Sequence, residues 1–237
     1  GPSACRLCRV CQELPGSRSP IVDRVPDRHA STVQGAGASP LRRLVVLSYR
    51  ITEPMIEQNK QAAIERALFK VIPGAVARKD FVLVDDAIEP AGEGVTGTPL
   101  YAGYDDEGKL KGVAMEAAAA GYADVIRILY GYDPYCQCIR GFEVLKMAET
   151  PGIGDKIVKD AAFLENFEAL EAKPNAAGDG LENPIVLVKQ GEKSNPWEID
   201  AITGATNSSK AVARMLNETS QAMAPIIIRN LSTLEGQ

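Results

Sequence analysis

Histidine is almost missing from this 237-residue chain, and its single copy, His29, lies near the N-terminus. A histidine-based catalytic triad or histidine metal site therefore cannot be built in the rest of the chain. Long apolar runs are missing as well. The sequence has no stretch of about 18 apolar residues, which is the length that a membrane-spanning helix needs. The nearest approach is the run 41–51, which is interrupted by Arg42, Arg43 and Arg50.

Lysine is missing from the first 43 residues, which hold seven Arg against three acidic residues and so carry a net charge of +4. The rest of the chain holds 19 basic and 28 acidic residues, a net charge of −9. An acidic body argues against nucleic acid as a partner, because nonspecific binding needs clustered Lys and Arg. The head is rich in Gly, Pro and Ser, and we expect it to be poorly ordered. A divergent N-terminus, an artificial junction and a misassigned reading frame all remain open as its origin.

The five cysteines allow two interpretations. Cys5, Cys8 and Cys11 have the spacing that opens bacterial iron–sulfur ligand runs, but Pro15 stands where the fourth cysteine should follow. Cys136 and Cys138 would have to complete such a site in space. The alternative, which we favour, is a head with incidental cysteines and no metal. An odd total leaves at least one thiol unpaired within the chain.

Hydrophobic periodicity predicts an α+β fold, a mainly antiparallel sheet with flanking helices, preceded by an N-terminal helix. That first helix should cover about 53–72 and end at Pro73-Gly74. Short β-type runs separated by Gly, Asp and Pro turns predict strands at 81–84, 100–104, 110–115, 126–130 and 139–145. Further along, we expect a helix over 161–170, a buried strand over 185–189, and a last helix that begins near Asn207 and is ended or kinked by Pro225.

Small hydroxyl residues gather before that last helix in the stretch DAITGATNSSKAV, residues 200–212. It is not a phosphate-binding P-loop, because the second glycine and the hydroxyl after Lys210 are both missing. It is not a Ser-x-x-Lys motif either, since Asn207 stands three residues before that lysine. Two interpretations remain: a helix cap made by Thr, Asn and Ser, or a phosphate site at a helix N-terminus.

The segment DAITGAT, residues 200–206, resembles the flavinylation motif of the FMN-binding domain family found in the G subunit of the Rnf electron-transport complex. The C subunit of the sodium-translocating NADH:quinone oxidoreductase is related. A second segment, ETPGIGDKI at 149–157, resembles the family's loop that lies against the flavin ring. The two motifs occur in the family's order, and the likeness extends over roughly residues 48–230.

The resemblance implies that a flavin transferase joins the phosphate of FMN to the hydroxyl of Thr206. Gly204 and Ala205 lack bulk, so a nucleotide can approach the backbone there. Lys156 would add positive charge near the flavin. The expected cofactor-binding residues, besides Thr206, are Thr203, Gly204, Ala205, Ser208, Ser209, Glu149, Thr150, Pro151, Gly152, Gly154, Lys156 and Tyr122.

By the same resemblance, four parts are expected: the Arg- and Cys-rich head 1–43, an apolar stub and membrane-proximal helix 44–75, a covalent FMN-binding domain 76–230, and a tail 231–237. Family members normally carry one N-terminal transmembrane helix, where this chain has its head. We therefore expect, from the family alone, an anchor in the cytoplasmic membrane and a flavin domain on the periplasmic or outer face.

The function implied is electron relay within a membrane-bound, ion-translocating oxidoreductase, in which the subunit has no catalytic activity alone. Its expected partners are the other membrane and redox subunits of an Rnf-type complex, with a flavin transferase for maturation. The alternative is a noncatalytic flavin-binding, sensory or assembly module. The short chain and the sequence around residues 149–157 favour the Rnf type over the quinone-reductase type.

Overall fold

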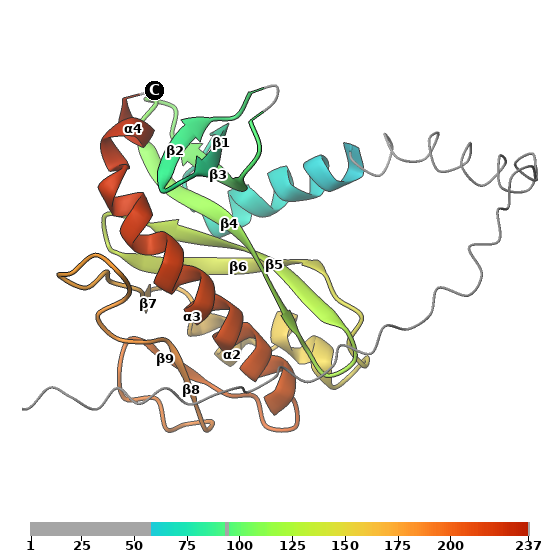
Figure 1. Ribbon diagram of the computed structural model, residues 1–237. Coiled ribbons are helices and arrows are strands. Elements are labelled where there is room, and N and C mark those ends of the chain that lie inside the picture. Colours follow the sequence, from blue (N-terminus) through green and yellow to red (C-terminus); the bar gives the residue numbers. More distant parts are fainter. Residues whose placement is uncertain (1–57, 93–94, 237) are drawn as a thin grey trace, which may run out of the picture. The chain divides into compact units, whose positions relative to one another are not determined.

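The computed structural model describes residues 58–92 and 95–236 (Figure 1). The head 1–43, its three cysteines and the apolar run 41–51 lie outside the described residues. Among the helices of the described part, none is long and apolar enough to cross a membrane.

A seven-stranded, fully antiparallel sheet forms the centre of the fold, in the order β2-β1-β3-β4-β5-β6-β7. The prediction of an antiparallel α+β fold is confirmed, and all five strands expected in this sheet are present. Two short strands, β2 and β7, were not predicted. The strands are β1 (Ala77–Val84), β2 (Ala87–Pro90), β3 (Thr98–Tyr104), β4 (Leu110–Ala120), β5 (Val125–Asp133), β6 (Cys138–Lys146) and β7 (Leu170–Glu171).

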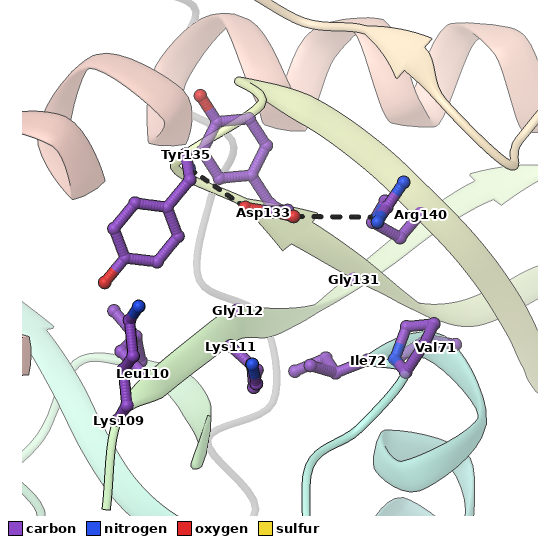
Figure 2. Close-up of a pocket in the computed structure, with 12 residues that line it drawn as sticks. Val71, Ile72, Lys109, Leu110, Lys111, Gly112, Gly131, Asp133, Tyr135 and Arg140 are labelled. Carbon is purple, nitrogen blue, oxygen red and sulfur yellow. Dashed lines mark hydrogen bonds and ion pairs between the residues drawn. The ribbon is translucent and has the colours of Figure 1, made fainter. Parts of the chain in front are cut away.

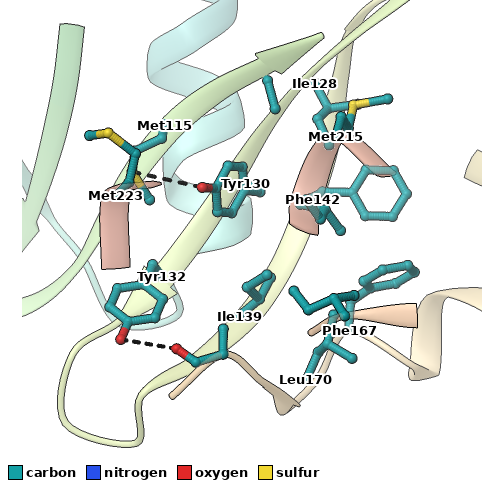
Figure 3. Close-up of a cluster of buried hydrophobic side chains, with 14 of the residues drawn as sticks. Met115, Ile128, Tyr130, Tyr132, Ile139, Phe142, Phe167, Leu170, Met215 and Met223 are labelled. Atoms are coloured by element: carbon teal, nitrogen blue, oxygen red, sulfur yellow. Dashed lines mark hydrogen bonds between the residues drawn. The ribbon is translucent and has the colours of Figure 1, made fainter. Parts of the chain in front are cut away.

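Each face of the sheet carries its own hydrophobic core, because alternate residues of a strand point to opposite faces. One face packs against the helix of residues 58–71, whose Ile64 and Leu68 are fully buried. The other face packs against α3 (Thr206–Arg229), which crosses the sheet in Figure 1. Figure 3 shows this second core, with Met115, Ile128, Tyr130, Tyr132, Ile139, Phe142, Phe167, Leu170, Met215 and Met223.

The helix of residues 58–71 ends where predicted, before Pro73 and Gly74. Gly74 has a φ of 83°, the left-handed conformation with which helices commonly end. The end of this helix lies directly on the sheet, because a Cβ atom at Gly131 would collide with the carbonyl group of Val71. A glycine in β5 therefore allows the close approach of helix and sheet.

Of the two effects predicted for Pro225, ending the last helix is wrong. Pro225 does not end α3, which continues to Arg229 and is followed by the short α4 (Leu231–Glu235). The residues around the proline, Ala224 and Ile226, are buried against the core. Burial of this face compensates for the backbone hydrogen bond that a proline inside a helix removes.

The expected helix over 161–170 is wrong in its second half, because α2 covers only Ala161–Glu165. Asn166 competes with the helix: its side-chain amide donates to the carbonyls of Ala162 and Phe163, at 3.2 and 3.0 Å. Its side-chain oxygen accepts the backbone N–H of Asp200 at 3.2 Å. Asn166 thus ends the helix and ties it to the segment before α3.

The expected buried strand over 185–189 is also corrected. It forms β8 (Val186–Val188), which pairs in parallel with β9 (Glu198–Asp200) in a separate two-stranded sheet. Val186 is exposed, and only the neighbouring Ile185 is fully buried. The continuous apolar run reflects packing against α3 on one side rather than insertion into the main sheet.

Candidate functional site

A cavity of about 390 Å³ opens where three segments meet: the turn 121–124 between β4 and β5, the loop 149–154 after β6, and the first turn of α3. The turn and loop stand at one end of neighbouring strands, so the sheet fixes both against the helix. The lining residues are Tyr122, Glu149, Thr150, Ile153, Gly154, Gly204, Ala205, Thr206, Asn207 and Ser208. Residues of both sequence motifs therefore share one cavity.

The carboxylate of Glu149 joins the three segments. One oxygen accepts the backbone N–H groups of Tyr122 and Ala123 at 3.0 and 3.1 Å. The other accepts the hydroxyl of Ser208, in the first turn of α3, at 2.7 Å. Glu149 is 8% exposed, so these bonds are largely shielded from water. We call this set of contacts the Glu149 clasp.

The clasp needs an ionised carboxylate. Burial by itself raises the pKa of Glu149, but the hydrogen bonds from Ser208 and from the backbone N–H groups of the 122–124 turn outweigh it. The net result is a pKa below the ordinary value of 4.5. At neutral pH the group is therefore charged and accepts all of these bonds.

Two glycines make room for this side chain. A Cβ atom at Gly154 would lie 2.6 Å from the Cβ and from a carboxylate oxygen of Glu149. A Cβ atom at Gly121 would collide with its other carboxylate oxygen. The second glycine of the Gly-x-Gly sequence, Gly154, therefore leaves space for the carboxylate of Glu149. The sequence alone did not reveal this role.

Gly204 and Lys156 bring the two motifs together a second time. Gly204 has a φ of 83°, a left-handed conformation that favours glycine. A Cβ atom on this residue would lie 4.0 Å from the ammonium nitrogen of Lys156. Lys156 does not line the cavity, but it places its positive charge beside the motif that ends in Thr206.

Thr206 is the first residue of α3 and is exposed at the cavity. Within the described residues, no partner hydrogen-bonds its hydroxyl, and no side chain caps the helix. The first turn also contains no acidic residue. The free amide groups and the helix dipole therefore make this end of α3 favourable for an anion.

The other hydroxyl residues have structural roles. The hydroxyl of Thr203 donates to the side-chain oxygen of Gln190 at 2.6 Å and does not line the cavity. Ser209 is fully buried; its hydroxyl donates to the carbonyl of Ala205 at 3.0 Å and accepts the N–H of Ile202 at 3.3 Å. Only Thr206 and Ser208 present hydroxyl groups to the cavity from this part of the motif.

Tyr122 lies at the cavity, in the turn between two strands rather than in a strand, and is 72% exposed. Pro151 and Gly152 form the exposed tip of the loop outside the lining. Two lining residues, Ile153 and Asn207, were not among the predicted site residues. Ile153 is 52% exposed. The sequence feature that could have indicated it is an apolar residue between two glycines of a loop.

The iron–sulfur interpretation loses its two C-terminal ligands. Cys136 and Cys138 are bonded to each other in a disulfide and so are not free thiolates. In the described part of the chain, no group of three or more His, Cys, Asp or Glu side chains could hold a metal ion. Cys5, Cys8 and Cys11 lie outside that part.

Comparison with known proteins agrees with this geometry. Residues 121–221 match the family model described as FMN-binding domain. The chain is 29% identical over 177 residues to the G subunit of the ion-translocating oxidoreductase complex of Methanosarcina acetivorans, covering 73% of this chain and 82% of that protein. It is 33% identical over 113 residues to the G subunit of the Na(+)-translocating ferredoxin:NAD(+) oxidoreductase complex of Acetobacterium woodii, covering 48% and 46% of the two chains.

A solved structure confirms the fold. The crystal structure of NqrC from Shewanella oneidensis superposes with a TM-score of 0.51 and 18% sequence identity, covering 72% of this chain and 87% of that one. The resemblance stated from the two motifs is therefore confirmed by sequence, and the antiparallel α+β architecture by structure.

Proposed function

We propose, from the premise that residues 121–221 form an FMN-binding domain, that this chain carries FMN bound covalently through the hydroxyl of Thr206. One observation carries the proposal: the two motifs, about fifty residues apart in sequence, line a single cavity. Thr206 is its exposed hydroxyl at a helix start without a side-chain cap among the described residues. The residues present therefore suit a phosphate followed by a planar ring.

The phosphate end is held by α3. In the proposed attachment, the flavin transferase breaks the Oγ–H bond of Thr206 and one P–O bond of an activated FMN donor; an Oγ–P bond forms, and the proton and the donor's leaving group are released. The remaining phosphate charge would lie at the free amides of the first helical turn. Lys156 faces the same place from the loop 149–154 side, near Gly204. A lysine ammonium suits a phosphate as a compact point charge.

The ring end is held by the turn 121–124 and the loop 149–154. Tyr122 and Ile153 are exposed apolar side chains on the cavity, and both have surface that a planar ring can cover. When bound, FMN supplies the electron chemistry, while the chain supplies position and electrostatics. The Glu149 clasp keeps both ring-side segments fixed relative to Thr206.

The relatives named above are subunits of ion-translocating oxidoreductase complexes. We propose the same setting here: an electron-relay subunit of an Rnf-type complex, with no catalytic activity alone. Its partners would be the other membrane and redox subunits and a flavin transferase. The flavin domain would lie on the outer face of the cytoplasmic membrane.

The attachment is tested by coexpressing the chain with a flavin transferase, denaturing it, and measuring flavin fluorescence that comigrates with the polypeptide. The wild-type chain is expected to retain flavin, and Thr206→Ala to retain none. Thr203→Ala is the matched control, because this hydroxyl belongs to the same motif but bonds Gln190 away from the cavity.

Undiminished flavin in Thr206→Ala contradicts the attachment site, and equal loss of flavin in both variants contradicts a role that is special to Thr206. The relay claim has a separate readout: the attached flavin must be reduced in the native complex by that complex's electron donor. A flavin that stays oxidised there would leave only a binding or assembly module.

A further inference from the structure

A disulfide joins Cys136 and Cys138 across the turn between β5 and β6. Cys136 lies in the turn 134–137, and Cys138 is the first residue of β6. The flavin cavity lies at the other end of β5, whose nine residues span roughly 26 Å at about 3.3 Å per residue. The disulfide is therefore a separate feature of the molecule.

This disulfide is poorly placed to stabilise the fold. A disulfide stabilises mainly by restricting the unfolded chain, and the effect is smallest for short loops; here the two cysteines are two residues apart. Gln137 between them has a φ of 54°, a left-handed conformation that is strained for a residue other than glycine. The turn also has other supports, since Asp133 accepts the N–H of Tyr135 at 2.9 Å and pairs with Arg140 at 3.6 Å.

The two sulfur atoms differ in access. Cys136 is exposed, whereas Cys138 is 4% exposed and is the first residue of β6, between β5 and β7. Thiol–disulfide exchange requires a thiolate to reach one sulfur atom and to displace the other. The geometry assigns attack to Cys136 and departure to Cys138.

A cavity lined by three basic side chains adjoins this turn. It has a volume of about 340 Å³, and its lining includes Asp133, Tyr135 and Arg140, which lie within a few residues of the two cysteines in sequence (Figure 2). The sulfur of Cys136 lies 3.7 Å from the backbone oxygen of Asp133. Lys109 and Lys111 line the same cavity.

The charges around this cavity favour an anion. Three lining cations, Lys109, Lys111 and Arg140, face one lining carboxylate, Asp133. Asp105 pairs with Lys111 at 3.3 Å, and Arg140 pairs with Asp133. Lys109 lies 5.9 Å from the centre of the Tyr135 ring and keeps its charge beside the turn. Tyr135 also donates its hydroxyl to Glu235 at 2.6 Å. Of the three lining cations, Lys109 alone forms no ion pair among the described residues, so its charge is available to a ligand.

We propose that Cys136–Cys138 is a thiol-exchange site for low-molecular-weight thiols that carry carboxylates. The thiolate of such a molecule attacks the sulfur of Cys136, the bond between the two cysteines breaks, and Cys138 leaves as a thiolate. A second thiol then attacks the mixed disulfide, releasing Cys136 and a disulfide of the two small molecules. Two thiols lose two electrons and two protons, and the cysteine pair gains them.

The test uses the full chain with Cys5→Ser, Cys8→Ser and Cys11→Ser, so that the pair is the only source of thiols. The protein is incubated with glutathione or with neutral 2-mercaptoethanol, and the released thiols are alkylated and counted by mass spectrometry. Both reagents are expected to reduce the pair. Lys109→Gln should lower the glutathione rate about two- to threefold and leave the mercaptoethanol rate unchanged. Lys189→Gln, an 87% exposed lysine that does not line the cavity, is the charge-matched control and should change neither rate.

Direction of attack is tested by single variants in the same background. With Cys138→Ala, Cys136 should form a mixed disulfide with oxidised glutathione about tenfold faster than Cys138 does in Cys136→Ala. A pair that resists millimolar glutathione overturns the proposal. Equal reactivity of the two sulfurs overturns the assigned direction, and equal effects of Lys109→Gln and Lys189→Gln overturn the role of the cavity. Thr206→Ala should leave every one of these rates unchanged, so this test is independent of the flavin.

Discussion

Glu149 is the side chain on which the flavin cavity depends most, because one buried carboxylate accepts hydrogen bonds from the turn 121–124 and from Ser208 in α3. Replacing it with Gln removes the charge and turns one acceptor into a donor that faces donors. We expect Glu149→Gln to lower the free energy of unfolding by about 1–3 kcal/mol, measured by urea denaturation at neutral pH. Asp155→Asn, directly after the loop 149–154 and outside the clasp, is the control; an equal loss there would contradict the special role of Glu149.

The same carboxylate predicts a pH dependence. Since its folded-state pKa lies below the ordinary value of 4.5, its stabilising effect is fully present above that value and is lost as the pH falls through the folded-state pKa. The difference in unfolding free energy between the wild type and Glu149→Gln should therefore shrink below pH 4.5. A difference that stays constant down to acid unfolding would contradict an ionised clasp.

Lys156 is expected to tune the attached flavin, because its ammonium group lies beside Gly204. Lys156→Gln removes a charge that favours the anionic reduced form. If this charge stabilises the reduced flavin by about 1 kcal/mol, its loss should lower the two-electron midpoint potential by about 20 mV. Redox titration of the attached flavin measures this change. Lys159→Gln is the control, since Lys159 pairs with Asp155. A larger shift of the potential in Lys159→Gln than in Lys156→Gln would contradict the role given to Lys156.

Sequence reasoning at the residue scale reached most of the cavity through the two motifs. It singled out Thr206 as the attachment residue but also placed Thr203 and Ser209 at the cofactor site. All three are small hydroxyl residues, and only packing directs the other two hydroxyls elsewhere. It also missed Ile153 and Asn207, which line the cavity. The proximity of Lys156 to Gly204 depends on contacts across some fifty residues, and no local pattern carries it.

At the scale of helices and strands, the central sheet was predictable, because alternating apolar residues and Gly, Asp and Pro turns mark its strands. The short β2 and β7 have too few residues to show such alternation. The predicted end of α2 was wrong because the side chain of Asn166 donates to a carbonyl of its own helix and accepts the backbone N–H of Asp200. Helix periodicity does not show this competition. The parallel β8–β9 pair depends on α3, because the side-chain oxygen of Asn217 in that helix accepts the backbone N–H of Ile185, just before β8.

The contact between the helix of residues 58–71 and the sheet makes a further prediction at this scale. Gly131→Ala places a methyl group against the carbonyl of Val71, so the helix must shift. We expect a loss of about 1–3 kcal/mol in the free energy of unfolding, measured by denaturation. Gly92→Ala, where among the described residues the nearest atom lies 4.0 Å from the added carbon, should be nearly neutral; equal losses would contradict the close approach.

At the scale of the whole described domain, the antiparallel sheet separates two sites along β5. One end holds the flavin cavity against the start of α3, and the other holds the disulfide turn. The proposed flavin chemistry and the proposed thiol exchange therefore have separate residues and separate tests. The sheet fixes both sites, and α3 aligns its N-terminus with only one of them.

The most direct test of the central claim is peptide mapping of the protein purified from its native membranes. After proteolysis, tandem mass spectrometry should find one flavin-bearing peptide, containing residues 200–209, with the mass of FMN joined through phosphate to Thr206. Flavin on Ser208, on Thr203 or on no residue of this peptide would contradict the proposed attachment.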